Sequence, residues 1–261
     1  MLKMSLRTHS KTLATLAVGV VVGGAVAGGG LALADNRVPR TDRQITNMTN
    51  EVSDIKAYYG DTVDAQGEHW PSPTGNYAKQ VAGIEKDAEK YLQRQARDDR
   101  GQRKAIVLDV DDTSLSTYNY ELETTFVYNP VSNAQYIATK TMPAVFGMNA
   151  LATWAQQQGY TVFFITGRPE SQRASTAANL AAVGFPAADA SHLYLKNAAT
   201  PPAYLPCGAT CTTIQYKSGT RAHIEDLGYK IVADFGDQNS DLSGGHAGQT
   251  YKLPNPMYYL P

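Results

Sequence analysis

The pattern of hydrophobic and polar positions is sharpest at residues 105–113, where an aliphatic run ends abruptly in acids. The run Ala105–Leu108 shows no alternation, which is typical of a strand buried on both faces of a parallel sheet. Asp109-Val110-Asp111-Asp112-Thr113 follows directly. Like charges this close raise one another's pKa unless a cation neutralises them. Because ligands bind beyond the carboxyl ends of parallel strands, the pattern predicts a cation-dependent reaction centre here.

Three later segments repeat the order helix, glycine, aromatic residue, strand. Glycine accepts the left-handed conformation that ends many helices, so each Gly-aromatic pair indicates a helix end. The pairs are Gly159-Tyr160, Gly184-Phe185 and Gly228-Tyr229, and the strands are expected at Thr161–Ile165, Leu193–Leu195 and Lys230–Asp234. Strands that alternate with helices predict βαβ units and a parallel sheet flanked by helices, which is an α/β fold.

Two amphipathic patterns precede this core. After a capping-box pattern at Thr41–Gln44, apolar residues recur at helical spacing from Ile45 to Tyr59, and Gly60 ends the run. A second helical run extends from Tyr77 to Tyr91. We expect both helices to pack on the core; the alternative is that they wall the substrate pocket. The aromatic stretch of residues 114–142 is too long for an ordinary βα loop and predicts a small cap over the strand ends.

The first 34 residues have the layout of a secretory signal peptide. Lys3, Arg7 and Lys11 precede an acid-free run, Leu13–Ala34, which closes with the small-x-small pattern Ala32-Leu33-Ala34. We expect cleavage after residue 34, secretion to the extracellular side and no stable membrane contact afterwards. A retained membrane anchor is the alternative, because the run is nearly long enough to span a bilayer.

The chain is therefore expected to have three parts. They are the leader 1–34, an N-terminal helical segment 35–103 packed on the core, and a catalytic core 104–261 that carries the small cap at about 114–142. With 43% hydrophobic and 18% charged residues, wholesale disorder is excluded. The formal net charge of −1 gives no reason to expect a nucleic acid polymer or an anionic membrane as partner. The sequence does not indicate an oligomeric state.

Four sequence features that could take part in catalysis fall on one edge of the expected sheet. They are the acids of residues 109–113, Thr166-Gly167-Arg168 after a strand, Lys217 at the expected start of the helix Lys217–Leu227, and Gly236-Asp237-Gln238-Asn239-Ser240-Asp241 after a strand. Taken singly, each has a structural interpretation as a turn, a cap or a solvated lysine. All four in this order favour a catalytic centre.

These residues resemble the four motifs of the haloacid dehalogenase (HAD) superfamily: Asp-x-Asp-x-Thr, a Thr or Ser, a Lys, and paired acids. More closely, the chain from Thr41 onward resembles the secreted acid phosphatases of this superfamily, which include bacterial class B/C-like enzymes and plant vegetative storage proteins. The segments that carry the closer resemblance are Leu108–Thr113, Ile165–Pro169, Tyr216–Ser218, Gly236–Leu242 and Lys252–Tyr259. The resemblance implies a HAD-like Rossmannoid parallel sheet with N-terminal helices and a small cap after the first core strand.

The resemblance also implies a role for each motif residue. Asp109 would be the nucleophile that forms an aspartyl-phosphate, and Asp111 would protonate the leaving alcohol and then activate water. Thr166 and Lys217 would bind the phosphoryl oxygens, with Gly167 in the same substrate-binding group. Because a halide leaves without protonation, dehalogenases lack an acid at the position of Asp111. Its presence here therefore favours a phosphate ester.

A divalent cation, most plausibly Mg²⁺, completes the implied site. Its ligands would be Asp109, the backbone carbonyl of Asp111 and Asp237, with Asp241 holding a bound water or completing the shell. The expected function is that of a secreted Mg²⁺-dependent acid phosphatase acting on small phosphomonoesters. The alternatives are a 5′-nucleotidase of the same fold and a non-catalytic extracellular storage or binding protein, although storage proteins often lose the nucleophile that this chain keeps.

Two aromatic residues and two cysteines carry further expectations. Tyr118 and Tyr120 could stack on an aromatic or nucleoside substrate, or pack in the core, and the sequence leaves both open. Cys207 and Cys211 are separated by three residues, and in an exported protein we expect a local disulfide rather than free thiols. The role of Asp234 stays open.

Overall fold

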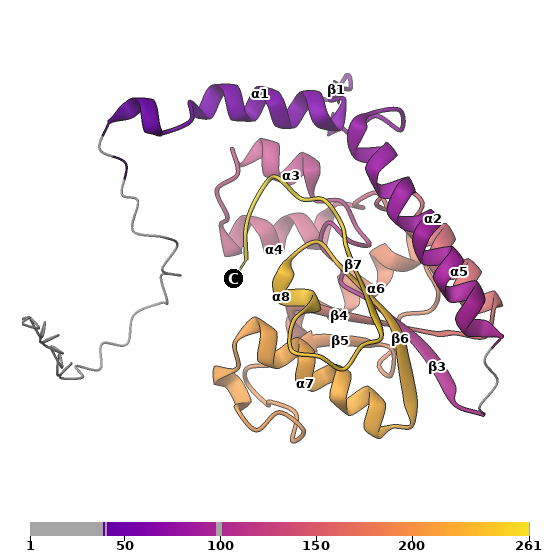
Figure 1. Cartoon of the computed structure of the whole chain (residues 1–261). Helices are drawn as coiled ribbons and strands as arrows, with labels where there is room; N and C mark the ends of the chain where they lie inside the picture. The colour runs from indigo at the N-terminus through magenta and orange to yellow at the C-terminus, as the bar shows by residue number, and fades with distance from the viewer. Residues whose placement is uncertain (1–38, 40, 98–100, 261) are drawn as a thin grey trace, which may run out of the picture. The chain divides into compact units, whose positions relative to one another are not determined.

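A five-stranded parallel sheet forms the centre of the computed structural model (Figure 1), as the repeated strand pattern predicted. In order across the sheet, the strands are β5 (Leu193–Lys196), β4 (Thr161–Pro169), β3 (Arg103–Leu108), β6 (Tyr229–Gly236) and β7 (Gln249–Lys252). The aliphatic run before the acids is therefore the central strand, and its last four residues are buried.

The structure describes residues 39, 41–97 and 101–260, which belong to one unit beginning at Pro39. The expected leader, residues 1–34, lies outside the described residues. Among those that are described, no helix combines the length and the apolar character that crossing a bilayer requires.

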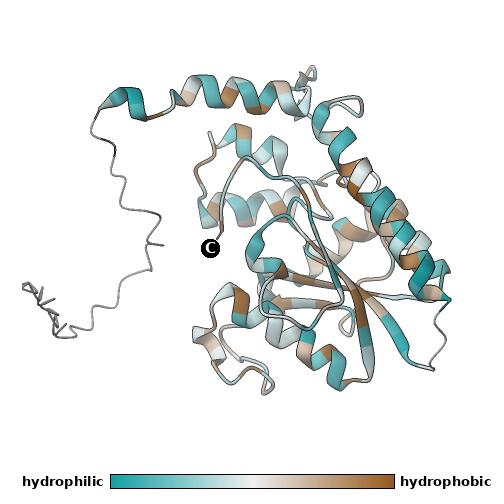
Figure 2. Ribbon diagram, in the orientation of Figure 1, coloured by the Kyte–Doolittle hydropathy of each residue, from teal (hydrophilic) through white to brown (hydrophobic). Residues whose placement is uncertain are grey.

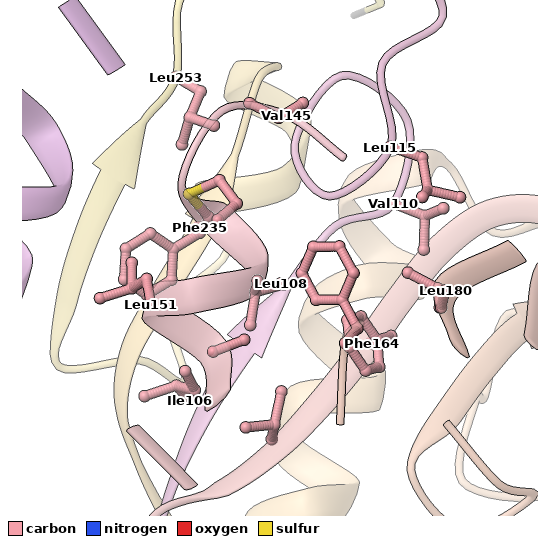
Figure 3. Close-up of a cluster of buried hydrophobic side chains, with 14 of the residues drawn as sticks. Ile106, Leu108, Val110, Leu115, Val145, Leu151, Phe164, Leu180, Phe235 and Leu253 are labelled. Atoms are coloured by element: carbon pink, nitrogen blue, oxygen red, sulfur yellow. The ribbon is translucent and has the colours of Figure 1, made fainter. Parts of the chain in front are cut away.

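Successive residues of β3 point to opposite faces of the sheet and fill two different cores. Ile106 and Leu108 belong to the larger one, which α2 (Asn76–Ala96) and α5 (Met148–Gln157) cover (Figure 3). Ala105 and Val107 belong to the smaller one, against α7 (Thr213–Asp226). Figure 2 shows the corresponding concentration of hydrophobic residues in the central strands. Helices cover both faces of the sheet, so a ligand site is expected at the polar carboxyl ends of the strands.

The first helix begins later than its capping-box pattern predicted. The segment Asp42–Gln44 forms a single 3₁₀ turn, η1, whereas α1 spans Met48–Tyr59. The reason is Asn47, whose side chain accepts hydrogen bonds from the N–H groups of the helix's first turn, 3.0 Å from Thr49. Gly60 ends α1 with a φ of +68°, as expected. A short antiparallel hairpin, β1 (Thr62–Val63) and β2 (His69–Trp70), connects α1 to α2.

Two short helices occupy the insertion expected after the first core strand. They are α3 (Tyr118–Glu123) and α4 (Pro130–Thr139), and they precede α5. Helix α4 lies against the turn η2 (Glu170–Gln172) and against α6 (Arg173–Ala182), which follow β4. The insertion therefore adjoins the carboxyl end of β4, as a small cap would.

The carboxyl half of the chain departs from the expected boundaries in several places. Strand β4 continues to Pro169 instead of ending at Ile165, so Thr166, Gly167 and Arg168 lie at the end of the strand and not after it. Helix α7 begins at Thr213 rather than at Lys217, because the Thr212 hydroxyl accepts the N–H of Gln215 at 3.2 Å and caps an earlier turn. Strand β7 had no hydrophobic signal, since it is a short polar edge strand. The remaining elements are the turn η3 (Gly208–Thr210) and the short helix α8 (Asn239–Leu242).

Candidate active site

Asp109 is the first residue beyond β3 and is held from its backbone outward. Its N–H donates to the carbonyl of Phe235 in β6 at 2.9 Å, and its own carbonyl accepts the Ser114 hydroxyl at 2.6 Å. The side chain is nearly buried. Burial raises the pKa of the Asp109 carboxyl well above its usual range, and the positive charge of Lys217 opposes this rise.

Lys217 reaches the same place from the second turn of α7. Its Nζ donates to Asp109 Oδ1 at 2.5 Å and to Asp241 Oδ1 at 2.6 Å. Burial works against its charge, but the two carboxylates raise the pKa of Lys217 above its ordinary value. Lys217 is therefore a fixed ammonium group between two acids that are distant in the sequence.

Asp237 and Asp241 follow β6, as the strand-end pattern predicted. The N–H of Gln238 donates to Asp241 Oδ2 at 2.8 Å. Burial and the neighbouring Asp241 raise the pKa of Asp237 to about 6. One carboxylate oxygen from each of Asp109, Asp237 and Asp241 can be chosen so that all three lie within 4.8 Å of one another.

This donor set fits a divalent cation. Asp109, Asp237 and Asp241 are all buried, and their oxygen atoms are the ligand type that hard cations prefer. Three carboxylates against one lysine leave two negative charges when all are ionised. A divalent cation would balance them and would lower the raised pKa values. We call Asp109, Lys217, Asp237 and Asp241 the floor of the cleft.

Asp111 stands at the edge of the cleft, with 30% of its side chain exposed. The guanidinium group of Arg168 donates to both of its oxygens, from Nε at 3.1 and 3.0 Å and from Nη2 at 2.6 Å. Arg168 is itself buried and donates to Thr176 Oγ1 at 3.0 Å. These bonds fix the direction of the Asp111 carboxyl group. The sequence did not indicate that Arg168 would pair with Asp111.

Gly167 lines the cleft, but Thr166 does not belong to its lining. Thr166 is fully buried, and its Oγ1 accepts the N–H of Arg168 at 3.1 Å. The hydroxyl therefore supports the turn that carries Gly167 and Arg168.

The floor opens into a cleft of about 430 Å³, a size typical of small-molecule sites. Residues of the cap, of the β4–α6 connection and of the carboxyl-terminal tail line it. They include Asp109, Asp111, Glu121, Phe126, Tyr128, Asn133, Gly167, Arg168, Gln172, Lys217, Asp237, Gln238, Asp241 and Tyr258.

The structure does not place Tyr118 and Tyr120 among the residues that line this cleft. Tyr118 is 1% exposed and stacks on Tyr59 with ring centroids 4.4 Å apart. Tyr120 is 2% exposed, and its hydroxyl donates to the carbonyl of Asn129 at 3.2 Å. Packing is thus the role that the structure gives them. The cap's aromatic residues in the cleft are instead Phe126 and Tyr128.

The carboxyl-terminal tail completes the site in a way that sequence reasoning missed. Asn255 donates to Asp237 Oδ2 at 2.7 Å, and the Tyr258 hydroxyl donates to Asp112 Oδ2 at 2.8 Å. Asp112 has a φ of +54° and also accepts the N–H of Thr117 at 2.9 Å. The tail, yellow in Figure 1, was part of the family resemblance, but no residue type in it pointed to this role.

Comparison with known protein families identifies the family of this chain. Residues 33–261 match the profile of "HAD superfamily, subfamily IIIB (Acid phosphatase)". The chain is a member of this acid phosphatase family. The family expected from the motifs is confirmed, and with it the assignment as a phosphomonoesterase.

Relatives of this acid phosphatase include both enzymes and storage proteins. It is 32% identical to Acid phosphatase 1 of Solanum lycopersicum over 81% of this chain and 80% of the relative. It is also 32% identical to Vegetative storage protein 1 of Arabidopsis thaliana, over 59% of this chain and 55% of the relative. The fold is similar to that of the class C acid phosphatase from Bacillus anthracis with tungstate bound, with a TM-score of 0.62, 19% identity, and coverage of 81% of this chain and 86% of that one.

Behind the floor of the cleft, Arg221 of α7 holds the loop that carries Asp241. It is 1% exposed and donates to the carbonyl oxygens of Asp241, Ser243 and Gly245. Its Nη1 lies 2.9 Å from Asp234 Oδ2. Asp234, whose role the sequence left open, is therefore the buried counter-charge of Arg221. Burial raises the pKa of Asp234 to about 7, and the charge of Arg221 opposes this rise.

Cys207 and Cys211 form a disulfide in the connection between β5 and α7. Cys211 immediately precedes Thr212, the residue that caps α7. The bridge thus constrains the chain just before the helix that carries Lys217.

Proposed function

We propose that this acid phosphatase is a Mg²⁺-dependent enzyme that hydrolyses small phosphomonoesters through an aspartyl-phosphate on Asp109. The observation that carries the proposal is the position of Asp109, which lies in the cleft with Lys217 at 2.5 Å and two further acids beside it. A carboxylate beside a fixed ammonium group and a cation site has what phosphoryl transfer requires.

In the first step, a carboxylate oxygen of Asp109 attacks phosphorus and forms a P–O bond. The bond between phosphorus and the ester oxygen breaks, and the leaving alcohol takes its proton from the carboxyl group of Asp111. Lys217 stabilises the negative charge of the transferring group. Thr166 is not placed to bind the phosphoryl group itself, because it is fully buried and does not line the cleft; its oxygen accepts the Arg168 N–H and so supports the cleft residues Gly167 and Arg168.

In the second step, Asp111 takes a proton from a water molecule that attacks the phosphorus atom. The bond to Asp109 breaks, and inorganic phosphate leaves with the free carboxylate restored. Arg168 holds Asp111 in place for both steps through its bonds to both carboxyl oxygens.

The floor residues Asp109, Asp237 and Asp241, with the Asp111 backbone carbonyl, would hold the Mg²⁺. When bound, the cation would supply positive charge to the phosphoryl oxygens. Asn255 and Gln238, which both donate to Asp237 Oδ2 at 2.7 Å, fix the orientation of this acid.

Secretion is part of the proposal. The leader pattern of residues 1–34 supports it, and so does the Cys207–Cys211 disulfide, a bond that is rare outside oxidising compartments. A nucleotide-specific enzyme has less support, because its expected stacking residues, Tyr118 and Tyr120, are buried in packing contacts.

The test is phosphate release from an aryl phosphate by the mature chain, before and after chelation. We expect activity to vanish with the chelator and to return with Mg²⁺. Asp109→Asn should lower turnover at least about 10⁴-fold, since it removes the nucleophile. Acid quenching with labelled substrate should trap phosphate on wild-type protein and none on the variant. Wild-type turnover in Asp109→Asn would refute the nucleophile assignment.

A further inference from the structure

Three polar side chains of the cleft have no partner for their polar groups within the described residues. They are Glu121 on α3, Asn133 on α4 and Gln172 on η2, and all of them line the cleft. No hydrogen bond or ion pair joins their side chains to another residue in the part of the chain that the structure describes. Helix α4 and η2 lie against each other, so two of these groups come from adjacent elements. We call the three residues the polar wall.

Glu121 is the most informative of them, because it is only 7% exposed. A carboxyl group that has lost most of its water without gaining a partner is costly, unless a ligand supplies the missing hydrogen bond. Its oxygens are not among the completely sealed unsatisfied atoms, so they remain accessible from the cleft. The Oε1 of Gln172, in contrast, is sealed and unsatisfied, so only the Nε2 amide group of Gln172 is left for a ligand in the cleft.

The polar wall adjoins the leaving-group side of the cleft. Burial, and then the charge of the nearby Asp111, raises the pKa of Glu121 to about 7. Asp111 is the residue proposed to protonate the leaving oxygen, whereas the floor residues bind the phosphoryl group. The turn η2, which carries Gln172, directly follows the strand that carries Arg168, the partner of Asp111, and α4 with Asn133 lies against η2. The polar wall is therefore on the side where the alcohol would lie.

The chemistry of the polar wall selects among ligands. Carboxylic acid and amide groups both donate and accept hydrogen bonds, which matches hydroxyl groups. An ammonium group would leave the amide donors without acceptors, and a second anionic group would meet the acids of the cleft. Phe126 and Tyr128 in the same lining offer apolar surface for carbon–hydrogen faces.

We propose that Glu121, Asn133 and Gln172 bind the hydroxyl groups of the leaving alcohol, so that the enzyme prefers phosphomonoesters of polyhydroxylated alcohols, such as sugar phosphates. This inference rests on the proposed function, since it names the substrate class of the same cleft. Glu121 is a specificity residue here and takes no part in bond breaking.

The experiment compares kcat/KM for a hexose 6-phosphate with that for phenyl phosphate, which has no hydroxyl on its leaving group. In Glu121→Leu, the hexose-to-phenyl ratio should fall about tenfold or more, through a higher KM for the hexose ester. Glu121→Gln keeps both hydrogen-bonding functions and should retain the ratio within about threefold. Asn133→Ala, on a partly exposed helix position, should lower the ratio in the same direction.

The matched control is Glu123→Leu. Glu123 lies on the same helix but is exposed, and it does not line the cleft. The ratio should not change in this variant. An unchanged ratio in both Glu121→Leu and Asn133→Ala, with phenyl phosphate still hydrolysed, would overturn the inference and leave the phosphatase mechanism standing.

A binding measurement separates the two proposals. In an Asp109→Asn background, calorimetry with hexose 6-phosphate and phenyl phosphate reports recognition without turnover. The added Glu121→Leu change should remove the preference for the hexose ester. If wild-type protein shows no turnover but this preference is present and lost with Glu121, the mechanism fails and the inference holds. Equal binding of both esters by Asp109→Asn would overturn the inference.

Discussion

On the floor of the cleft, Lys217 binds Asp109 and Asp241 directly, whereas the polar wall presents Glu121, Asn133 and Gln172 without partners among the described residues. The floor groups are held by the protein itself, so they need little rearrangement when a phosphoryl group arrives. The groups of the wall are left for the alcohol. The two proposals thus assign phosphoryl chemistry and substrate choice to two sets of residues, one satisfied internally and one that a ligand would complete.

The floor should be the more sensitive of the two regions. Lys217→Met removes the only ammonium group that the described structure places between Asp109 and Asp241. We expect activity to fall about 10³-fold, and the free energy of unfolding to fall by about 3 kcal/mol because two buried carboxylates lose their counter-charge. Aryl phosphate turnover and urea unfolding measure the two effects. A variant with unchanged stability would show that the floor is not an internally paired unit.

Asp111→Asn tests the general-acid role of Asp111, the residue at the edge of the cleft between the floor and the polar wall. Because the amide has no proton to give, turnover of alkyl phosphates should fall about 10³-fold. Aryl phosphates have better leaving groups, so their cleavage should fall far less. The slope of log kcat/KM against leaving-group pKa measures this dependence, and it should become steeper in the variant. Equal losses for all esters would contradict the general-acid role.

Arg221→Lys probes the support behind the floor. A lysine cannot donate to the three carbonyl oxygens that Arg221 reaches, so the loop carrying Asp241 should loosen. We expect kcat/KM to fall about tenfold, with a higher Mg²⁺ concentration needed for half activation. Calorimetric titration with Mg²⁺ checks the binding without turnover. If only thermal stability changes, Arg221 supports the fold and not the cation site.

Glu85 provides a comparison outside the cleft, since its Oε1 is also buried without a hydrogen-bond partner. Burial raises its pKa to about 7 in the folded protein. The folded state therefore binds more protons than the unfolded state between the ordinary carboxyl pKa and about 7. The stabilising contribution is complete below that window and is lost as pH rises through it.

Glu85→Gln should therefore raise the free energy of unfolding by about 1 kcal/mol near pH 8 and change it little near pH 4. Thermal unfolding at the two pH values measures the difference. Asp87→Asn, an exposed acid on the same helix, is the control. If Glu85→Gln is less stable than wild type near pH 8, the Glu85 carboxylate has a stabilising partner. Glu85 would then no longer serve as a comparison with the unpaired groups of the polar wall.

Much of the floor could be predicted, because strand ends can be read locally. The aliphatic run before Asp109, the strand whose end carries Thr166 and the strand before Asp237 place these residues at the carboxyl edge of the sheet in any right-handed α/β fold. Two boundaries at the site were wrong: β4 extends to Pro169, beyond the expected Ile165, and α7 begins at Thr213, because Thr212 and Gln215 form a capping box.

The supports of the site could not be predicted in the same way. Arg168 and Asp111 are 57 positions apart, and their pairing depends on the path of the last residues of β4, where its pairing with β5 becomes irregular between Thr166 and Pro169. In the sequence, the tyrosines of α3 could equally form a stacking surface for a substrate. Only their packing, Tyr118 on Tyr59 and Tyr120 against Tyr136, distinguishes the two roles. Contacts of this kind depend on which residues are neighbours in three dimensions, and the periodicity of hydrophobic residues in the sequence does not report this.

The tail contacts have a consequence for biosynthesis. Asn255 and Tyr258, which hold Asp237 and Asp112, leave the ribosome after every residue of the four motifs. A nascent chain therefore carries an unfinished centre until its tail has emerged and docked. For the same reason, we expect proteolytic cleavage before Asn255 to inactivate the enzyme although it removes no motif residue.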